Sequence, residues 1–178
     1  KARLTLGRLL FDQGKYAAAK VYLSDHAHAV GAEAGDRLQF LLAECDFHLA
    51  AIARDDYRFN TADELLTTAR RRYEGLFDNR DRNRDDPLAA DQALYREAAF
   101  KIGVCYQAAT DPDYVRALLA FLRARAEYHD SPLDGDMLVR IARCYAELQR
   151  RERSIEVLYD LLRQMSDGTA PRDQVDQL

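Results

Sequence analysis

Few residues of this chain could carry covalent or metal chemistry, since it has 3 cysteines and 4 histidines among 178 residues. Cys45, Cys105 and Cys144 lie too far apart in the sequence to pair as zinc ligands, which normally stand a few residues from one another. His26 and His28 are two residues apart, so on a helix they point to different sides and do not readily share a metal. No motif pairs a cysteine with a general base, so we expect no nucleophilic catalysis.

Motifs for other kinds of site are missing as well. The sequence contains no Gly-rich phosphate loop, no Gly-x-Ser-x-Gly nucleophile elbow and no His-Glu-x-x-His zinc motif. Asp81-x-Asn83-x-Asp85 resembles the start of a calcium loop, but the central Gly is lacking and Gln92 stands where the terminal Glu belongs. We therefore expect no enzyme, no metal and no cofactor, and we interpret residues 78–86 as a zwitterionic surface loop.

The overall charge and hydropathy narrow the choice of partners. The formal net charge is −4 and the pI is about 5.6, whereas binding to a nucleic-acid backbone needs many uncompensated cations. The basic run at residues 70–72 is followed by acidic residues and is interpreted as a solvated helix face. No apolar stretch approaches the roughly 18 residues that cross a bilayer. We expect neither nucleic-acid binding nor direct membrane insertion.

The three cysteines occupy one position of an internal repeat. Each ends a triplet of a small residue, any residue and Cys, and each triplet follows a bulky aliphatic residue: Leu42 before Ala43–Cys45, Ile102 before Gly103–Cys105 and Ile141 before Ala142–Cys144. A fourth copy, Leu6-Gly7-Arg8-Leu9, has Leu in place of Cys. Such a repeat indicates an array of similar units, which is a binding scaffold more often than a catalyst.

The small residues of this repeat are expected to lie where two helices cross closely, because bulk at the crossing would keep the helices apart. Gly7, Ala43, Gly103 and Ala142 are 36, 60 and 39 residues apart. The long middle interval is explained here by extended connections at residues 51–60 and 78–86 and by a longer third hairpin. A closed helical bundle is the alternative fold, since helical periodicity alone does not exclude it.

Equivalent positions in stacked repeats lie about 8–10 Å apart or more, beyond the roughly 7 Å Cα separation that a disulfide tolerates. The three cysteines are therefore predicted to be free, buried thiols that pack as small hydrophobes. Free thiols favour a reducing, cytoplasmic compartment, with a periplasmic or envelope location as the alternative.

The helix-period pattern predicts eight helices, paired as four antiparallel hairpins. The expected ranges are 1–12, 15–30, 36–54, 62–77, 87–109, 112–128, 132–149 and 152–165, and residues 172–178 could begin a ninth helix. Turns are expected at Gln13-Gly14 and Asp111-Pro112, and Gly31 and Gly35 are expected to close the first hairpin. Start signals are a Thr61-x-x-Glu64 capping box and the Asp86-Pro87 and Ser131-Pro132 pairs.

These landmarks resemble tetratricopeptide repeats, helix hairpins of about 34 residues with small residues at the crossings. The matching residues are Leu6-Gly7, Leu10, Gly14, Tyr16 and Ala19 in the first hairpin, Leu42-Ala43, Ala62 and Leu66 in the second, Ile102-Gly103, Tyr106, Tyr114 and Ala117 in the third, and Ile141-Ala142, Tyr145 and Leu158 in the fourth. Departures are Asp46 for an aromatic residue, and Gln149, Arg151 and Ser154 where Gly, Tyr and Ala are usual. The resemblance implies an all-α fold, an α-solenoid of about four hairpins, with residues 1–178 as a single domain.

One short connector points to a subgroup of the family. Residues 127–132, Glu-Tyr-His-Asp-Ser-Pro, are similar to a Tyr-Pro-Asp-Ser-Pro connector that is frequent in bacterial envelope repeat proteins, with His129 replacing the first Pro. This similarity implies a bacterial protein of the envelope-assembly type.

In this family the first helices of successive hairpins line a concave groove. Transferring that register implies a groove lined by Leu4, Arg8, Phe11, Phe40, Glu44, Phe47, His48, Phe100, Val104, Gln107, Val139, Arg143 and Glu147. Four of the 7 phenylalanines fall in this set. Aromatic anchors bordered by Arg and Glu would suit an extended peptide or an amphipathic helix, although phenylalanines at helical spacing more often belong to a core.

The sequence therefore predicts a non-enzymatic protein–protein interaction scaffold that binds a peptide or helix of a partner in a concave groove. The alternative is a structural spacer or assembly module within a larger polypeptide or a bacterial envelope complex, without a peptide ligand. Lys1 falls within an apolar-periodic segment and residues 172–178 look like half a helix. These open ends predict either a fragment of a longer chain or end-to-end self-association, because repeat arrays normally carry polar caps.

Overall fold

The computed structural model describes residues 2–27, 35–79, 90–128 and 132–166, which form eight α-helices and no strand. The helices are α1 (Ala2–Asp12), α2 (Tyr16–Asp25), α3 (Gly35–Asp55), α4 (Phe59–Asn79), α5 (Ala90–Ala108), α6 (Tyr114–Glu127), α7 (Asp134–Glu147) and α8 (Arg151–Ser166). The all-α class and the number of helices agree with the sequence prediction.

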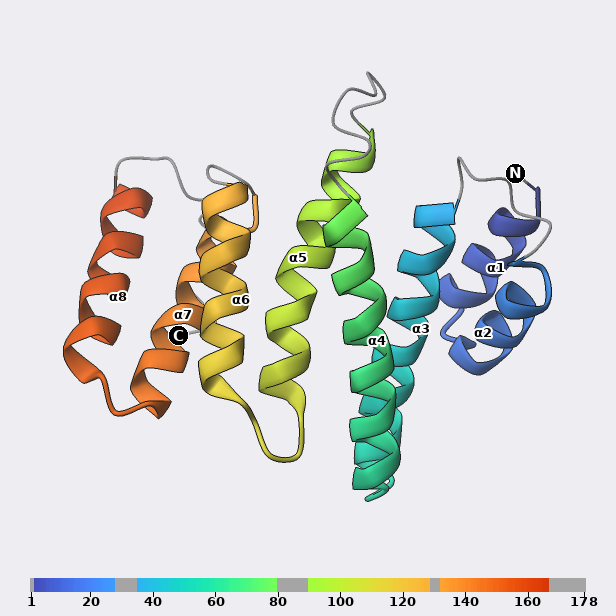
Figure 1. Ribbon diagram of the computed structural model, residues 1–178, viewed down its shortest axis with the longest axis horizontal. Helices are drawn as coiled ribbons and strands as arrows, with labels where there is room; N and C mark the ends of the chain where they lie inside the picture. The colour runs from blue at the N-terminus through green and yellow to red at the C-terminus, as the bar shows by residue number, and fades with distance from the viewer. Residues whose placement is uncertain (1, 28–34, 80–89, 129–131, 167–178) are drawn as a thin grey trace.

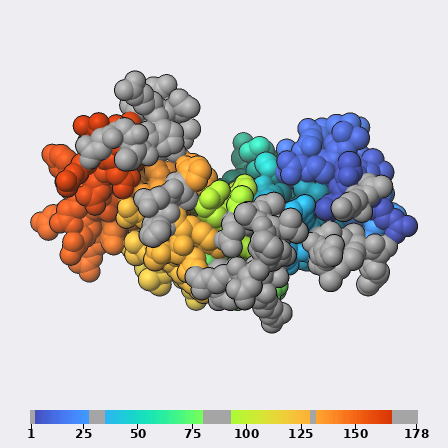
Figure 2. All heavy atoms as spheres, turned by 90° about the horizontal axis from the view of Figure 1, so that it is seen from above, coloured from blue at the N-terminus to red at the C-terminus, as the bar shows by residue number. Residues whose placement is uncertain are grey.

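The helices lie side by side in a row from α1 to α8 (Figure 1), and each packs against the next one along the chain. The pairs α1–α2, α3–α4, α5–α6 and α7–α8 form antiparallel hairpins (Figure 1). The first helices of neighbouring hairpins also meet, since α3 contacts both α1 and α5. Seen from above, the coloured helices follow one another in sequence order from the blue end to the red end (Figure 2). This packing of consecutive helices is consistent with a helical repeat.

The repeated small residues lie at close helix crossings, as predicted. A Cβ added at Gly103 would come within 2.5–2.7 Å of three ring atoms of Phe121 on α6. A Cβ added at Gly7 would meet the side chain of Leu23 on α2, with Cγ at 2.7 Å. Ala43 and Ala142 are 0% and 2% exposed. The absence of bulk at these positions therefore allows the helices of a hairpin to approach closely.

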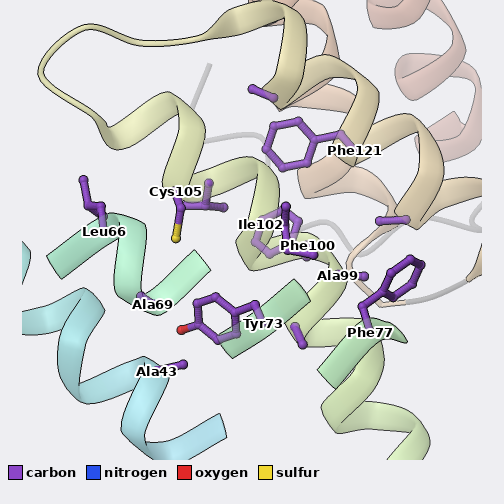
Figure 3. Packing of buried hydrophobic residues seen from close by; sticks show 14 of the residues in the cluster. Ala43, Leu66, Ala69, Tyr73, Phe77, Ala99, Phe100, Ile102, Cys105 and Phe121 are labelled. Carbon is purple, nitrogen blue, oxygen red and sulfur yellow. The ribbon is translucent and has the colours of Figure 1, made fainter. Parts of the chain in front are cut away.

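Two clusters of buried residues make up the core. The larger one joins α3 to α7 and includes Tyr73, Phe77, Phe100 and Phe121. In Figure 3, Tyr73 reaches from α4 towards α3, and Phe121 on α6 lies over α5. The smaller cluster packs α2 against α3. The core thus runs along the row of helices instead of being gathered at one centre.

Three of the four hairpins turn in the same way. The second residue after the helix adopts a left-handed conformation at Gly14 (φ 73°), Tyr57 (φ 60°) and Gln149 (φ 61°). In each, the next amide donates to a carbonyl five residues back, from Lys15, Arg58 and Arg150 to Leu10, Ala53 and Tyr145 respectively. This is the Schellman geometry that ends a helix. Gln149 therefore adopts the conformation that Gly favours, at the position where the tetratricopeptide pattern that the sequence resembles usually has Gly.

The second hairpin differs from the prediction. Residues 51–60 are not an extended connection, because α3 continues to Asp55 and α4 already begins at Phe59. Thr61 consequently lies inside α4, and the capping box predicted there is wrong. The left-handed turn residue lies 7 residues after Gly7 and after Ala142, but 14 residues after Ala43. Seven residues are nearly two helical turns, so the insertion lengthens the hairpin without rotating its buried face.

Other predicted boundaries moved by a few residues. The second helix ends at Asp25 instead of residue 30, Gly35 begins α3 instead of closing the first hairpin, and α7 begins at Asp134, after Pro132. The turn at Asp111-Pro112 is confirmed between α5 and α6. Gly31, the Asp81–Asp85 acidic motif, the Asp86-Pro87 start signal, His129 with Ser131, and the expected ninth helix lie outside the described residues.

Candidate binding face of the first helices

The residues predicted to line a groove all lie on α1, α3, α5 and α7, the first helices of the four hairpins, and we call them the first-helix face. They differ widely in exposure. The half-buried members are Leu4, Phe11, Phe40, Phe47, His48, Gln107 and Val139, the exposed members are Arg8, Arg143 and Glu147, and the buried members are Glu44, Phe100 and Val104.

The four phenylalanines of this face do not share one environment. Phe100 is 8% exposed and its ring lies 5.7 Å from that of Phe121, so it packs in the core together with Val104. Phe11, Phe40 and Phe47 keep part of their surface in solvent. Of these four phenylalanines, the ones that a partner could reach therefore lie on α1 and α3.

A cluster of four aromatic rings joins the first two hairpins. The Phe11 ring is 5.2 Å from Tyr16 and 5.4 Å from His48, both edge to face. Tyr16 and His48 stack at 4.5 Å with an interplanar angle of 7°. Phe47 meets His48 edge to face at 6.0 Å. Because each ring is half-buried, the cluster both packs α1 and α2 on α3 and presents aromatic surface outward.

Two cations that the sequence analysis missed complete this face. The Lys101 Nζ lies 4.7 Å from the centre of the Phe47 ring and 3.0 Å from Glu44 Oε2, so it reaches from α5 back to α3. Arg140 lies over Phe100 and donates to Gln107 Oε1 at 2.9 Å, so it reaches from α7 back to α5. Both stand two residues before the small residue of their helix, a spacing that could have revealed them in the sequence.

Glu44 interacts with several polar and charged side chains at the face. The residue is 8% exposed, and its carboxylate accepts a hydrogen bond from the Tyr73 hydroxyl and one from Lys101 at 3.0 Å. Burial raises the pKa of Tyr73, and the Glu44 carboxylate raises it further, so the phenol stays a donor. Burial lowers the pKa of His48, and Lys101 adds to this, although Glu44 opposes it. His48 is therefore favoured in its neutral form.

Glu97 shows that side chains of three first helices share one electrostatic environment. Loss of solvent raises the pKa of this carboxyl, and repulsion from Glu44 on α3 raises it further. Lys101 and then Arg8, the latter from α1, oppose the rise. Arg8 and Glu97 thus influence each other although α3 stands between their helices in the sequence. A ligand lying on this face would contact groups from three hairpins at once.

Asp46 explains the main departure of the second hairpin from the repeat pattern. It is 0% exposed, and its carboxylate pairs with Lys20 at 2.6 Å and with Arg72 at 3.3 Å. The three side chains come from α3, α2 and α4. Where the tetratricopeptide pattern that the sequence resembles has an aromatic residue, this chain carries a charge that ties two hairpins together. Asp46 therefore joins packed helices and does not face the solvent.

The cysteines fulfil the sequence prediction that they are free and buried. Burial raises the pKa of Cys45 and of Cys105 to about 12, and it raises the pKa of Cys144. A thiol with such a pKa stays protonated near neutral pH, when it is a poor nucleophile. In Figure 3, Cys105 points from α5 towards Leu66 on α4, so these thiols contribute to packing between helices.

Two hollows of the described surface lie elsewhere. One of about 590 Å³ is lined by residues including Arg70, Tyr106 and Tyr114, and one of about 410 Å³ by residues including Phe77, Tyr106 and Arg123. None of the first-helix face residues lines either hollow. Among the described residues no three His, Cys, Asp or Glu side chains gather in a way that could hold a metal ion. No described helix combines the length and the apolar character that a membrane span requires.

No protein-family model matches this chain, and a search of curated proteins also gives no match. The evidence on what the chain does is therefore the repeated register of its sequence and the arrangement of side chains described above.

Proposed function

We propose that this chain is a non-enzymatic interaction scaffold, a tetratricopeptide-like α-solenoid that binds a peptide or helix of a partner protein along the first-helix face. The observation that carries the proposal is the half-buried aromatic cluster of Phe11, Tyr16, Phe47 and His48. Aromatic rings held rigidly at a surface are the usual anchors of protein interfaces, and these come from three helices that meet at one place.

The charges around the cluster indicate the chemistry of the ligand. Lys101 over Phe47 and Arg8 over Phe11, the latter at 5.9 Å, present cations beside the apolar surface. The Glu44 carboxylate beside them is buried and already paired with Lys101. An amphipathic segment with an apolar side chain on the rings and an acidic side chain that displaces Asp12 from its exposed ion pair with Arg8 would match both features.

The proposal is tested by selecting peptides from a displayed library against the chain and measuring their affinity for variants. Phe47→Ala is expected to weaken binding about tenfold or more, as loss of an interface anchor usually does. Phe59→Ala is the matched control, because Phe59 is 43% exposed at the α3–α4 turn and lies off the face. Thermal unfolding verifies that both variants fold.

The binding site is located by amide chemical shifts recorded with a selected peptide. Shifts confined to α1, α3 and α5 and to the start of α2 around Tyr16 are expected. Peptides that shift only residues around the two hollows beside α4 and α6 would place the interaction on another surface and contradict the proposal. Failure to enrich any peptide would favour the second candidate below.

The second candidate is a structural spacer or assembly module without a peptide ligand, including one within a bacterial envelope complex. Large apolar side chains exposed on α1 and on α8 favour it, namely Leu6 (44%), Leu9 (51%), Ile155 (53%) and Leu162 (53%). The envelope setting rests on the connector at residues 127–132 alone, of which 129–131 lie outside the described residues.

A further inference from the structure

An apolar stripe runs along the outer side of α8. Ile155, Tyr159 and Leu162 are 53%, 69% and 53% exposed. They are spaced four and three residues apart, so they fall on one face of the helix. Large apolar residues in such a stripe normally cover a neighbouring helix. The question is which helix α8 would cover.

Equivalent positions on the other second helices, α2, α4 and α6, show which neighbour this face contacts. Each second helix has a buried small residue at its crossing, namely Ala19, Ala62, Ala117 and Ser154. The residues one and eight positions later lie on one face, since seven residues are nearly two turns.

On α2, α4 and α6 this face binds the following first helix. Lys20 pairs with Asp46 on α3, Arg70 donates to the Tyr106 hydroxyl on α5, and Arg125 pairs with Asp134 on α7. On α8 the same two positions are Ile155 and Leu162. The stripe of α8 is therefore the face through which a second helix receives the next first helix.

The first helix of the chain exposes the complementary face. Leu6 and Leu9 stand one residue before and two residues after Gly7 and are 44% and 51% exposed. The equivalent pairs are buried on every other first helix: Leu42 3% and Cys45 0%, Ile102 8% and Cys105 3%, and Ile141 1% and Cys144 0%. The pair on α3 packs with Ala19 and Leu23 of the preceding second helix. The face of α1 is thus the one that a preceding second helix covers.

We propose that copies of this chain associate head to tail, with the α8 stripe of one copy seated on Leu6 and Leu9 of the next. The contact repeats the internal α2–α3 arrangement, and both of its halves are exposed on the same molecule. Leu9, which replaces the cysteine of the other repeats, enlarges the apolar surface on the α1 side. Because the two faces differ, the contact is heterologous, so it builds open chains of copies or a ring, not a two-fold dimer.

The test blocks one face at a time in the 178-residue chain. Leu9→Glu places a charge on the α1 face and Leu162→Glu places one on the α8 face. In sedimentation velocity, the unmodified chain is expected to grow beyond a dimer as its concentration rises, whereas each variant alone stays a monomer. An equimolar mixture of the two variants retains one intact pair of faces, so it is expected to form a dimer and nothing larger.

Val115→Glu is the matched control, because Val115 is as exposed as Leu162, at 53%, but lies on α6. It is expected to associate like the unmodified chain, and circular dichroism melts check that all three variants fold.

A chain that stays monomeric at every concentration overturns the proposal. If that monomer shows slow amide exchange along α8, an intramolecular contact covers the stripe. If Leu9→Glu alone still forms dimers, the association is a symmetric α8–α8 contact and the head-to-tail proposal is wrong. Peptide binding by the first-helix face is measured separately and is unaffected by any of these outcomes.

Discussion

The second and fourth hairpins follow the same repeat and end their first helices with the same left-handed turn, yet their outer faces are opposite in character. The second hairpin, α3–α4, is covered on both sides and buries the carboxylates of Glu44 and Asp46, which are paired with cations from α2, α4 and α5. The fourth, α7–α8, packs inward through Ile141 and Cys144 but exposes Ile155 and Leu162 outward.

The difference shows that the repeat register specifies where a neighbour contacts a helix but not how. At the second-helix position that receives the next hairpin, the chain uses Lys20 on α2 to bind a buried acid and Ile155 on α8 to offer an apolar surface. Charge pairs select one partner, because a wrong partner leaves a buried charge uncompensated. Apolar contacts supply association energy with less selectivity.

The largest loss of folding stability is expected from Asp46→Ala in the second hairpin. Removing the buried carboxylate leaves Lys20 and Arg72 without their shared counter-ion, and losing one partner of a buried ion pair costs about 3–5 kcal/mol. The lower end applies, because the two cations keep 34% and 27% of their side-chain exposure. The free energy of unfolding in urea measures the loss. The exposed pair Arg8–Asp12 is the control, and Asp12→Ala should cost less than about 1 kcal/mol.

A smaller loss of folding stability is expected from Tyr73→Phe. This change removes the hydroxyl that donates to Glu44 and leaves a buried carboxylate with fewer donors, which costs about 1–3 kcal/mol. Tyr159→Phe on α8 is the comparison, since Tyr159 is 69% exposed and its loss should stay within about 0.5 kcal/mol. Equal effects at both positions in thermal unfolding would mean that the Glu44 cluster adds nothing to the second hairpin.

The left-handed turn that the second and fourth hairpins share predicts that glycine at this position increases the stability of the fold. Gln149 and Tyr57 adopt φ near 61° and 60°, where a Cβ is strained and glycine is not. Gln149→Gly and Tyr57→Gly are each expected to stabilise the fold by about 0.5–1 kcal/mol, measured by chemical denaturation. Gly14→Ala, at the equivalent turn of the first hairpin, should destabilise by a similar amount. Destabilisation by Gln149→Gly would show that its side chain outweighs the backbone strain.

The smallest expected effect is a pH dependence in the second hairpin. The folded-state pKa of His48 is lowered below its ordinary value of 6.5, so the unfolded chain binds a proton more readily than the folded one. The stability that the neutral imidazole contributes is present above pH 6.5 and is lost as the pH falls through the unfolded and then the folded pKa. His48→Gln should therefore lose less stability than the unmodified chain between pH 7 and 5.5 in urea titrations. The raised pKa of Glu97 acts in the opposite direction, but it is present in both chains and cancels in the difference. If the free energy of unfolding changes equally with pH in both chains, the lowered pKa of His48 is contradicted.

Much of the fold could be predicted because it depends on local patterns. The spacing of Gly7, Ala43, Gly103 and Ala142 identified the close crossings, and turn signals such as Gln13-Gly14 located hairpins. The second hairpin was misread because residues 51–60 were assigned to a connection to explain the long interval between Ala43 and Gly103, whereas α3 and α4 both extend into this stretch. Assignment to the tetratricopeptide family stays a prediction, as do the binding role and the compartment.

The candidate site was only partly predictable for a related reason. The register identified positions on the first helices, and the half-buried Phe11 and Phe47 lie among them. It did not identify Lys101, whose role depends on Phe47 and Glu44 of another hairpin, nor did it show that Phe100 would be covered by Phe121. Contacts between residues far apart in sequence depend on how closely the helices finally approach.

The sequence by itself determined that this chain forms paired helices, which faces of those helices are apolar, and that three buried positions carry thiols, because helix periodicity and small-residue spacing act over a few turns. Only the tertiary structure decided that Asp46 is a buried junction of three helices and that Leu6, Leu9, Ile155 and Leu162 meet solvent. The physical reason is that burial belongs to a pair of surfaces: the same register position is interior where a neighbouring helix covers it and exposed where none does.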